Sequence, residues 1–456
     1  MPLPHDRPMP SYWLSFSSDL SKHRTTETVP QEADVVVVGS GYSGAATAYH
    51  ILENDDGKRT RVVILEARDV CSGATGRNGG HVKPDLYFNA SLYEKRFGPR
   101  AAEALTEFET QQVMEVKKLV EKEQIDCDFE LVRALDVFVD SRVAGPTVAA
   151  YKNMKANGYH FPDDLHFVSD PKKAEQVSGV KGALAAFSHT AASIWPYKMV
   201  THLLHRCLGW GANLQTNTPV LSISDLSDGS GRWRVKTPRG EVVTKKVVVA
   251  ANAYLSALLP EFNDKIIPAR GIVCRIAVPE QGKMAPHLNN SYSIRYGPQE
   301  YDYLISRTDG SIIVGGAKQK VLLDDAYWHN NTDDSQLIPG AANYFDGYMQ
   351  RLFHGWENSG AKVTHTWTGV MGYSSDLMPW VGEMPGKPGI YVTAGFTGHG
   401  MPRILGCATA IASLVRGDVQ YLSETKIPPP YWITKDRLRV KKNIAREYMA
   451  GSRPSL

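Results

Sequence analysis

The stretch Asp34-Val-Val-Val-Val38-Gly39-Ser-Gly-Tyr-Ser-Gly44 decides the fold of this chain. Four successive valines predict a short strand buried on both faces, as in parallel sheets. The glycines that follow fit the pattern G-x-G-x-x-G, and a small-residue helix is expected from about Gly44 to Leu52. A second buried strand, Arg61-Val-Val-Ile-Leu-Glu66, then ends in an acid. This order predicts a dinucleotide-binding βαβ unit over residues 33–67.

Each position of this motif has a physical role toward a pyrophosphate and a ribose. Gly39 permits the tight turn, Gly41 lets the backbone approach the pyrophosphate, and Gly44 lets helix and strand pack closely. Glu66 accepts the ribose hydroxyls and disfavours NADP, but it does not separate FAD from NAD. A purely structural turn in an α/β sheet is the alternative. The expected cofactor contacts here are Gly39, Ser40, Gly41, Tyr42, Ser43, Gly44, Glu66, Ala67 and Arg68.

A second glycine-rich run follows Glu66 closely, and it favours FAD over NAD. A plain NAD dehydrogenase does not need such a run, whereas the isoalloxazine end of FAD must pass close to the protein backbone, which small residues allow. Arg77 can pair with a phosphate or with a substrate carboxylate; an ordinary surface loop is the alternative. The expected FAD contacts here are Ser72, Gly73, Ala74, Thr75, Arg77, Asn78, Gly79, Gly80 and His81.

A third glycine-rich run lies between a predicted buried strand at 390–394 and a small-residue helix at 402–415. Backbone N–H groups at the start of that helix can stabilise negative charge on a reduced flavin. A structural turn is again the alternative. The expected FAD contacts here are Gly395, Phe396, Thr397, Gly398, His399, Gly400 and Met401.

The rest of the chain predicts two domains, each built from discontinuous segments. Residues 91–125 read as amphipathic helices, 196–205 as a helix entered at a proline, 232–244 as a hairpin and 246–252 as a buried strand. Residues 266–320 alternate apolar and polar side chains, which predicts an antiparallel sheet with one wet face. We therefore expect four parts: an N-terminal arm (1–32), an FAD-binding domain (33–90, 191–265 and 362–430), a substrate domain (91–190 and 266–361) and a C-terminal tail (431–456). The basic run at 435–442 in this tail is expected to be solvated.

Composition excludes several other classes of function. The net charge of +3 is too small to indicate a nucleic-acid partner. Five scattered cysteines without a C-x-x-C pair favour a reducing compartment and argue against a metal site. No apolar run is long enough to span a membrane, and the polar, proline-rich start is unlike a signal peptide, so the cytoplasm is the expected location. A peroxisomal location is only weakly supported, because the chain ends in Pro-Ser-Leu rather than Ser-Lys-Leu.

Together these motifs resemble those of the FAD-dependent amine and amino-acid oxidoreductases, the family of D-amino-acid oxidase, glycine oxidase and monomeric sarcosine oxidase. The resemblance spans nearly the whole chain. The sequence Gly-Arg-Asn-Gly-Gly-His and the Tyr12-Trp13 pair are most similar to those of the γ-glutamylputrescine oxidase branch. Besides the three glycine-rich runs, the matching segments are Trp195-Pro-Tyr-Lys198 with Val220, Val247-Val-Val-Ala-Ala-Asn252, Trp367-Thr-Gly-Val-Met-Gly372 and Asp376-Leu-Met-Pro-Trp-Val-Gly382.

The resemblance implies a fold of mixed α/β and α+β class, with a Rossmann-type FAD-binding domain and a substrate domain built on an antiparallel sheet. It implies an enzyme that moves a hydride from the carbon bearing a small-molecule amine to flavin N5. The imine would hydrolyse, and the electrons would pass to O2, giving H2O2, or to another acceptor. Such a site orients the C–H bond and keeps the amine neutral. Further FAD contacts implied by the resemblance are Val220, Ala250, Asn252 and Gly369.

Two departures from the family pattern bear on substrate and cofactor. In the α-amino-acid oxidases an arginine follows the W-x-G segment and holds the substrate carboxylate; here that segment continues to Tyr373 without an arginine, which disfavours an α-amino-acid substrate. In the sarcosine oxidase branch a nearby cysteine bonds to the flavin. None occurs here, so we expect non-covalent FAD, with a link through His81 as the alternative.

Candidate catalytic residues come from strands expected over the flavin. Tyr301, Tyr303 and Arg307 share one parity, and together they can hold a carboxylate or a carbonyl; the alternative is that they complete a solvated sheet face. Tyr254 follows the strand at 246–252. His399 is expected to contact the flavin rather than to act as an acid or base.

Three rival functions remain open. A D-amino-acid or N-methyl-amino-acid dehydrogenase would use an acceptor other than oxygen. A flavin monooxygenase would carry a G-D-A-x-H-type segment before its last helix, which this sequence lacks. A tRNA-modifying folate/FAD protein would need a basic face, against which the near-neutral charge argues.

Overall fold

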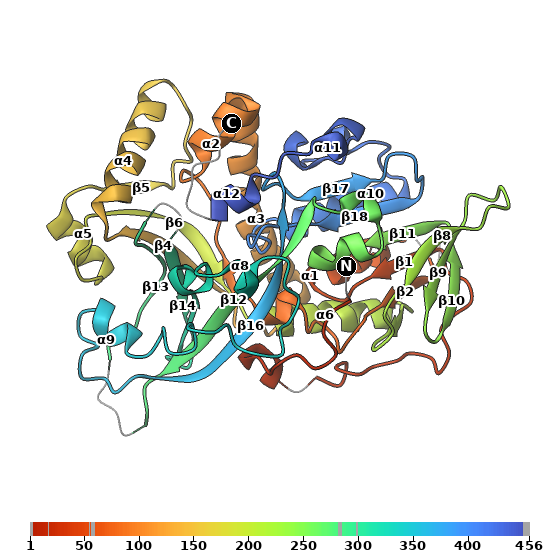
Figure 1. The fold of residues 1–456 in the computed structure, drawn as a ribbon, viewed down its shortest axis with the longest axis horizontal. Coiled ribbons are helices and arrows are strands. Elements are labelled where there is room, and N and C mark those ends of the chain that lie inside the picture. The colour runs from red at the N-terminus through yellow and green to blue at the C-terminus, as the bar shows by residue number, and fades with distance from the viewer. Residues whose placement is uncertain are drawn as a thin grey trace.

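Two large β-sheets organise the protein, with helices packed around them (Figure 1). The computed structural model describes residues 3–16, 18–53, 55, 60–280, 285–297 and 300–449. Within that part of the chain, no helix combines the length and the apolar character that a membrane span requires. The described helices are α1 (Tyr42–Glu53), α2 (Ala90–Phe97), α3 (Pro99–Glu123), α4 (Ser141–Ala156), α5 (Pro171–Ser178), α6 (Pro196–Gly209), α7 (Lys318–Val321), α8 (Asp325–Trp328), α9 (Tyr348–Leu352), α10 (Ile404–Arg416), α11 (Lys435–Arg439) and α12 (Ala445–Met449).

The first sheet has the predicted nucleotide-binding topology, in the order β17-β18-β11-β1-β2-β7. Its strands pair in parallel except at the edge, where β17 runs antiparallel to β18. The sheet is covered on both faces: Val35 and Val37 pack with α1, α6 and α10, whereas Val36 and Val38 face the three-stranded sheet β8–β10. The strands are β1 (Val35–Val38), β2 (Val62–Leu65), β7 (Asn213–Gln215), β8 (Ser222–Asp225), β9 (Trp233–Thr237), β10 (Gly240–Thr244), β11 (Lys246–Val249), β17 (Trp380–Glu383) and β18 (Ile390–Ala394).

The second sheet is mixed, in the order β16-β12-β15-β14-β13-β4-β6-β3, with β5 beside β6. Within 266–320 all pairs are antiparallel, as predicted. The sheet as a whole is not, because β4 from the earlier segment joins β13 in parallel. The strands are β3 (His81–Val82), β4 (Glu130–Phe138), β5 (His166–Val168), β6 (Ala185–Ser193), β12 (Ile266–Ala277), β13 (Asn290–Arg295), β14 (Tyr301–Ser306), β15 (Ile312–Gly316) and β16 (Lys362–Ser374).

The long strands β12 and β16 connect the two halves of the molecule. They pair along their length, from Ile266 opposite Ser374 to Ala277 opposite Lys362. The 3-10 helix at Asn252–Ala257, which follows β11 directly, packs on both strands. In Figure 1 these strands run from the outer edge of the mixed sheet toward the nucleotide-binding sheet. Whatever binds at the ends of β1 and β11 is therefore close to the mixed sheet.

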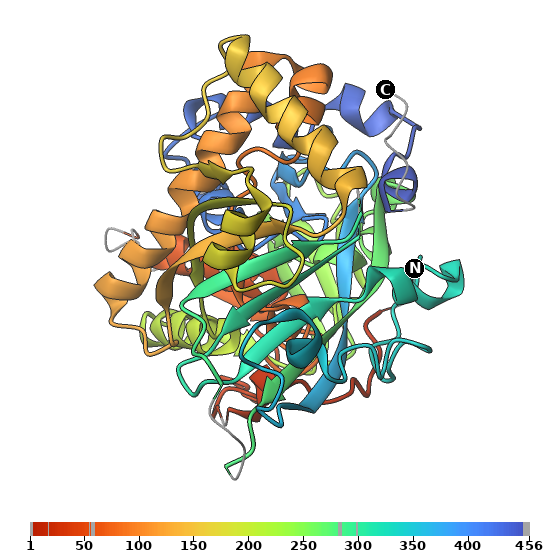
Figure 2. The same cartoon turned by 90° about the vertical axis from the view of Figure 1, so that its left-hand side faces the viewer.

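The helices of residues 90–156 gather on one side of the mixed sheet, as Figure 2 shows. α3 also belongs to the core of the nucleotide-binding half, because Leu105 and Phe108 join the same buried cluster as Ile404 and Ile411 of α10. Sequence alone assigned α3 to the substrate domain. Its packing also brings a buried face to the start of α10. Glu109 lies on that face and pairs with Arg403 there.

The described parts of the N-terminal arm and of the C-terminal segment both pack on the rest of the protein. In the N-terminal arm, Trp13 is fully buried and its Nε1 donates to the Asn78 carbonyl at 2.5 Å. The basic C-terminal segment, predicted to be solvated, is only partly so. Tyr431 is fully buried, and Arg437 stacks on Trp380 and pairs with Asp376. That prediction was wrong for Arg437 because its partners lie some 60 residues earlier, beyond the reach of local pattern. Residues 450–456 of the predicted tail lie outside the described residues.

Candidate active site

A cavity of about 390 Å³ lies at the carboxyl ends of β1, β2, β11 and β18 and extends to the mixed sheet. In open parallel sheets ligands bind at this edge, where neighbouring strands connect in opposite directions. All three predicted glycine-rich runs line this cavity, although they are far apart in sequence. The fold therefore assembles the three motifs into one site.

The first motif forms the tight end of the cavity. Gly39 has φ = 104°, and a Cβ there would lie 2.9 Å from the Ala250 carbonyl oxygen. A Cβ on Gly44 would lie 1.9 Å from the Gly39 carbonyl oxygen, so no larger residue allows α1 to pack against β1 in this way. The start of α1 faces the cavity through Gly41 and Ser43. Backbone N–H groups of a first helical turn lack intrahelical partners and can bind a phosphate.

Glu66 lies at the end of β2, where the motif predicts a ribose-binding acid. Its Oε2 accepts hydrogen bonds from the Ser40 N–H (2.8 Å) and hydroxyl (2.7 Å), and its Oε1 accepts one from the Arg68 N–H (3.0 Å). These bonds fix the carboxylate at the cavity wall. Because each carboxylate oxygen accepts about two hydrogen bonds, Oε1 retains the capacity to accept a ribose hydroxyl.

Most of the predicted FAD contacts line the cavity, and a few lie behind it. Ser40 supports Glu66, and Gly44 packs against the Gly39 backbone. A Cβ on Gly80 would lie 2.5 Å from the Ile194 carbonyl oxygen, so its smallness serves protein packing. The predicted contacts that are not part of the cavity wall are Ser40, Gly44, Ser72, Gly80 and Gly395; the others line it.

Arg77 lines the cavity, and each of its three guanidinium nitrogens donates to a carbonyl oxygen of the protein. Its Nε donates to the Ser72 carbonyl (2.8 Å), and its two terminal nitrogens donate to the Thr368 (2.9 Å) and Met9 (2.7 Å) carbonyls. Asp334 lies 3.4 Å from Nε. These contacts give Arg77 a structural role, and its binding of a phosphate or a substrate carboxylate stays a prediction. Its buried charge ties the N-terminal arm and β16 to the second glycine-rich run.

Asn252 anchors the third glycine-rich run. It was predicted as the end of a strand, but β11 stops at Val249 and Asn252 adopts a left-handed conformation with φ = 44°. This turn directs its side chain across the sheet edge, where Oδ1 accepts the Gly395 N–H at 3.0 Å. Thr397 in turn donates its N–H to the Gly372 carbonyl of β16 at 2.7 Å. The run is thus fixed to both halves of the molecule.

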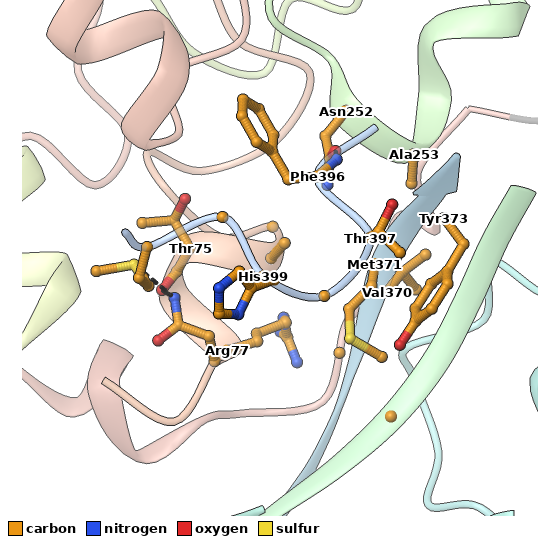
Figure 3. Close-up of a pocket in the computed structure, with 18 of the residues that line it drawn as sticks. Thr75, Arg77, Asn252, Ala253, Val370, Met371, Tyr373, Phe396, Thr397 and His399 are labelled. Atoms are coloured by element: carbon orange, nitrogen blue, oxygen red, sulfur yellow. Dashed lines mark hydrogen bonds between the residues drawn. The ribbon is translucent and has the colours of Figure 1, made fainter. Parts of the chain in front are cut away.

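His399 projects into the cavity from this run. In Figure 3, Thr75 lies to the left of it, Arg77 below it, and Met371 and Tyr373 to the right. Its Nε2 lies 2.8 Å from Oε2 of Glu109, a residue of α3 that is buried and also pairs with Arg403. Burial raises the pKa of Glu109, but Arg403 and His399 outweigh it and hold the pKa at about 2. A buried carboxylate therefore orients His399, and the sequence offered no sign of it.

The predicted tyrosines of β14 face the cavity as expected. Tyr301 and Tyr303 both line it, with ring centroids 6.5 Å apart. Tyr303 lies against the second glycine-rich run, since a Cβ on Gly79 would be 2.2 Å from its ring. Tyr254 also lines the cavity, and its hydroxyl is buried with no hydrogen-bond partner among the described residues.

Arg307 does not face the cavity, so its prediction as a substrate-binding residue was wrong. β14 ends at Ser306, and the alternation of a strand does not extend beyond its end. The Arg307 guanidinium pairs with Asp128 and lies over the rings of Trp13 and Trp195, at 5.2 and 5.1 Å from their centroids. It fastens the N-terminal arm to the mixed sheet.

Other cavity residues had no recognised signal in the sequence. Arg295 at the end of β13, Lys318 at the start of α7 and Lys83 beside β3 place cationic groups on the wall formed by the mixed sheet. Tyr448 of α12 closes the same wall from the C-terminal segment. Isolated basic residues near strand ends are common, and only the assembled sheet shows that these converge.

The geometry is compatible with non-covalent flavin. His81 lines the cavity, and its Nε2 makes a 2.8 Å hydrogen bond with the Ser291 hydroxyl. Burial, then the nearby charge of Lys83, lowers the pKa of this imidazole. All five cysteines are described and buried, and none of them is part of the cavity wall.

The residues present fit FAD. The glycine turn and the first turn of α1 offer N–H groups for a pyrophosphate, and Glu66 offers an acceptor for the ribose. Gly73 borders open space, with no atom within 4 Å of a Cβ built there. The start of α10 faces the same cavity beside His399, where positive helix ends favour negative charge.

A dinucleotide site that runs from a parallel sheet to a second, mixed sheet is typical of a flavin-dependent oxidoreductase. The family described as "DAO: FAD dependent oxidoreductase" matches residues 34–414. The chain belongs to this family. It is an FAD-dependent enzyme that acts on amine or amino-acid type substrates.

Individual relatives agree with this assignment. The chain is 24% identical to gamma-glutamylputrescine oxidoreductase of Escherichia coli over 418 residues, 89% of each protein. Among solved structures it resembles glycine oxidase from Geobacillus kaustophilus, with a TM-score of 0.69, 18% identity and coverage of 89% of this chain and 99% of the other. L-amino acid deaminase from Proteus vulgaris gives a TM-score of 0.67 at 18% identity, covering 91% and 96%. These structural likenesses bear on the fold alone.

Proposed function

We propose that this enzyme oxidises the C–N bond of an amine to an imine. When bound, FAD supplies the two-electron acceptor, taking a hydride at N5 from the carbon that bears the nitrogen. Water then adds to the imine, which yields an aldehyde or ketone plus ammonia or an amine. With O2 as the final acceptor, the two electrons from the amine and two protons would give H2O2. The observation that carries the proposal is the convergence of three glycine-rich runs on one cavity walled by Tyr301 and Tyr303.

The residues of this chain orient the substrate and control its charge. Tyr303 and Met371 form walls on the mixed-sheet side of the cavity, and they hold a C–H bond against the cofactor while excluding water. A neutral amine is required for hydride loss. Burial in the cavity beside Tyr303 and Met371 disfavours the charged ammonium form, so it helps keep the bound amine neutral. No dedicated general base is needed in this scheme.

We further propose that the substrate is an amine without a closely held α-carboxylate. The segment after Trp367 lacks the arginine that its resemblance to α-amino-acid oxidases would require. Arg77 and Arg307, the sequence-based candidates for carboxylate binding, are both engaged in structural contacts. The relative at 24% identity is named for gamma-glutamylputrescine, which makes that compound one candidate substrate.

An anaerobic flavin-reduction screen tests this function. Purified protein should show flavin absorbance near about 370 and 450 nm, and acid precipitation should release the flavin. We expect polyamines or acylated diamines to bleach the flavin without oxygen, and air to restore the colour with one H2O2 for each amine oxidised. Bleaching that only an artificial dye reverses would identify a dehydrogenase instead of an oxidase. Bleaching by D-amino acids alone would contradict the proposed substrate class, and a colourless protein would contradict the proposal as a whole.

A further inference from the structure

The wall formed by the mixed sheet carries two cationic side chains around one aromatic ring. Arg295 ends β13, Lys318 begins α7, and both line the cavity. Cζ of Arg295 lies 5.1 Å from the ring centroid of Tyr301, and Nζ of Lys318 lies 4.7 Å from it. Two positive groups therefore lie against the same ring of the cavity wall.

The positive charge at this wall exceeds what the protein itself neutralises. Arg295 is 6% exposed, and its Nε has no hydrogen-bond partner among the described residues. Its Asp136 partner lies 3.8 Å away and is shared with Lys83 at 3.0 Å. Asp85, the further acid at this wall, accepts bonds from neighbouring N–H groups. No carboxylate in the described ranges lies within ion-pair distance of Lys318, so three cations face two acids.

An anion that fits this position has the chemistry of a carboxylate. A guanidinium presents a planar fork that matches two carboxylate oxygens, and an ammonium adds a point charge. The Arg295 guanidinium lies over the Phe88 ring, with Cζ 3.5 Å from the ring centroid, which restricts its position. Tyr448 and Leu92 complete the wall with apolar surface. Such surroundings suit an alkyl chain that ends in a carboxylate.

The ring that the two cations contact is not the ring that lies against the second glycine-rich run. Tyr303 rests against Gly79 of the second glycine-rich run, and Tyr301 is the next ring outward, 6.5 Å from Tyr303. Arg295 and Lys318 lie around Tyr301 rather than Tyr303. A carboxylate bonded to the carbon that is oxidised would have to lie beside Tyr303. One held at Arg295 belongs to the opposite end of the substrate.

We infer that Arg295 and Lys318 form a specificity subsite for a carboxylate at the end of the amine substrate remote from the carbon that is oxidised. This inference rests on the proposed amine oxidation and names its substrate class, an amine and a carboxylate joined by a chain. Both residues bind substrate in this assignment. Neither takes part in moving electrons.

A matched set of amines tests the subsite on the FAD-bound enzyme. Flavin reduction is measured without oxygen for a series of ω-amino acids from butanoate to octanoate, for alkylamines of equal length, and for the corresponding α-amino acids. We expect an ω-amino acid to be the best substrate. In Arg295→Gln, kcat/KM for it should fall on the order of 30-fold or more, because a buried charge partner is lost, while alkylamines change much less. In Lys318→Met, kcat/KM for the same substrate should fall about 10-fold, since the point charge of an ammonium group is less specific.

Matched variants separate the subsite from effects on folding. Lys320 lies on the same short helix as Lys318 but is exposed and does not line the cavity. Lys320→Met should therefore leave kcat/KM unchanged for every amine. Arg295→Lys should recover part of the preference for ω-amino acids. Equal losses for ω-amino acids and alkylamines in Arg295→Gln would show a structural role and overturn the inference. If the enzyme prefers α-amino acids and loses that preference in Arg295→Gln, the carboxylate is not at the remote end of the substrate, and the inference is overturned.

A binding measurement keeps this inference independent of the proposed reaction. Calorimetry of the FAD-bound protein with octanoate and hexanoate, which have no amine to oxidise, should give weaker binding in Arg295→Gln than in wild type or Lys320→Met. If no amine of any kind reduces the flavin but this difference persists, the proposed reaction fails and the carboxylate subsite stands. If amines reduce the flavin while the acids bind wild type and variant alike, the subsite fails and the reaction stands.

Discussion

The two ends of the cavity are built in different ways. The end at the parallel sheet is made largely of backbone: the glycine turn, the first turn of α1 and the acid Glu66, all contained in about 30 residues. The end at the mixed sheet is made of side chains such as Arg295, Lys318 and Tyr448, supplied by elements far apart in the chain. Backbone geometry tolerates almost no substitution, whereas side chains can be exchanged one at a time. The cofactor end is therefore expected to be rigid and the substrate end adjustable.

The strongest test of this difference is Gly44→Ala at the cofactor end. The new methyl group would lie 1.9 Å from the Gly39 carbonyl oxygen, so α1 must move away from β1. We expect purified protein without bound flavin and a loss of more than about 3 kcal/mol in unfolding free energy, because overpacking forces the backbone apart. Flavin-to-protein ratio and denaturant titration measure both effects.

Gly209→Ala is the matched control for that variant. Gly209 lies in α6, which packs on α1, but no atom comes within 4 Å of a Cβ built there. Alanine is favoured over glycine in a helix, so flavin content should be unchanged and stability equal or slightly higher. Full flavin content in Gly44→Ala would refute the view that the cofactor end is rigid.

Glu109→Gln tests the junction between the two ends. The variant leaves Arg403 buried without its carboxylate partner and replaces the carboxylate that orients His399 with a neutral amide. We expect a loss of about 2 to 3 kcal/mol in unfolding free energy, since one partner of a buried ion pair is removed. Flavin should still bind, but more weakly. An unchanged stability would show that the Arg403 charge is compensated elsewhere.

The same variant should remove part of the acid sensitivity. In the folded protein the pKa of Glu109 is held at about 2, below its ordinary value of 4.5. A carboxyl group with a lowered pKa contributes stability that is fully present above its ordinary pKa and is lost as the pH falls toward the folded value. The stability difference between wild type and Glu109→Gln should therefore shrink as the pH falls from 4.5 to 2. A difference that stays constant over this range would contradict the assignment.

Arg307→Met should have the smallest effect and no specific effect on substrate. The residue was a sequence-based candidate for substrate binding, but the fold places it between Asp128 and two tryptophans of the arm interface. We expect a loss of about 1 to 2 kcal/mol in unfolding free energy, from one ion pair and its stacking contacts. kcat/KM should change less than about 3-fold for every amine. A larger change in kcat/KM that is confined to carboxylate-bearing amines would show that Arg307 binds the substrate after all.

Local pattern predicted most of the secondary structure and the cofactor end. Val35–Val38, Val62–Leu65 and the hairpin of β9 and β10 all form where periodicity and turn residues placed them. Failures occurred where a side chain depends on distant partners. Glu109 lies on an amphipathic helix, and its buried partner Arg403 is 294 residues away. Arg77 and Arg307 look free in the sequence, but carbonyls and a carboxylate elsewhere in the chain engage them.

The sequence by itself determined that this chain holds a dinucleotide, because a glycine turn between a buried strand and a small-residue helix is a local backbone requirement. The second and third glycine-rich runs extended that conclusion to FAD, which the family match then established. Only the tertiary structure decided which charges line the cavity. Arg295 and Lys318 point into the cavity while Arg77 and Arg307 do not have free guanidinium groups, and no spacing in the sequence distinguishes them. The physical reason is that a charged side chain is available to a ligand only if protein groups do not already pair with it, and tertiary packing determines which groups lie around it.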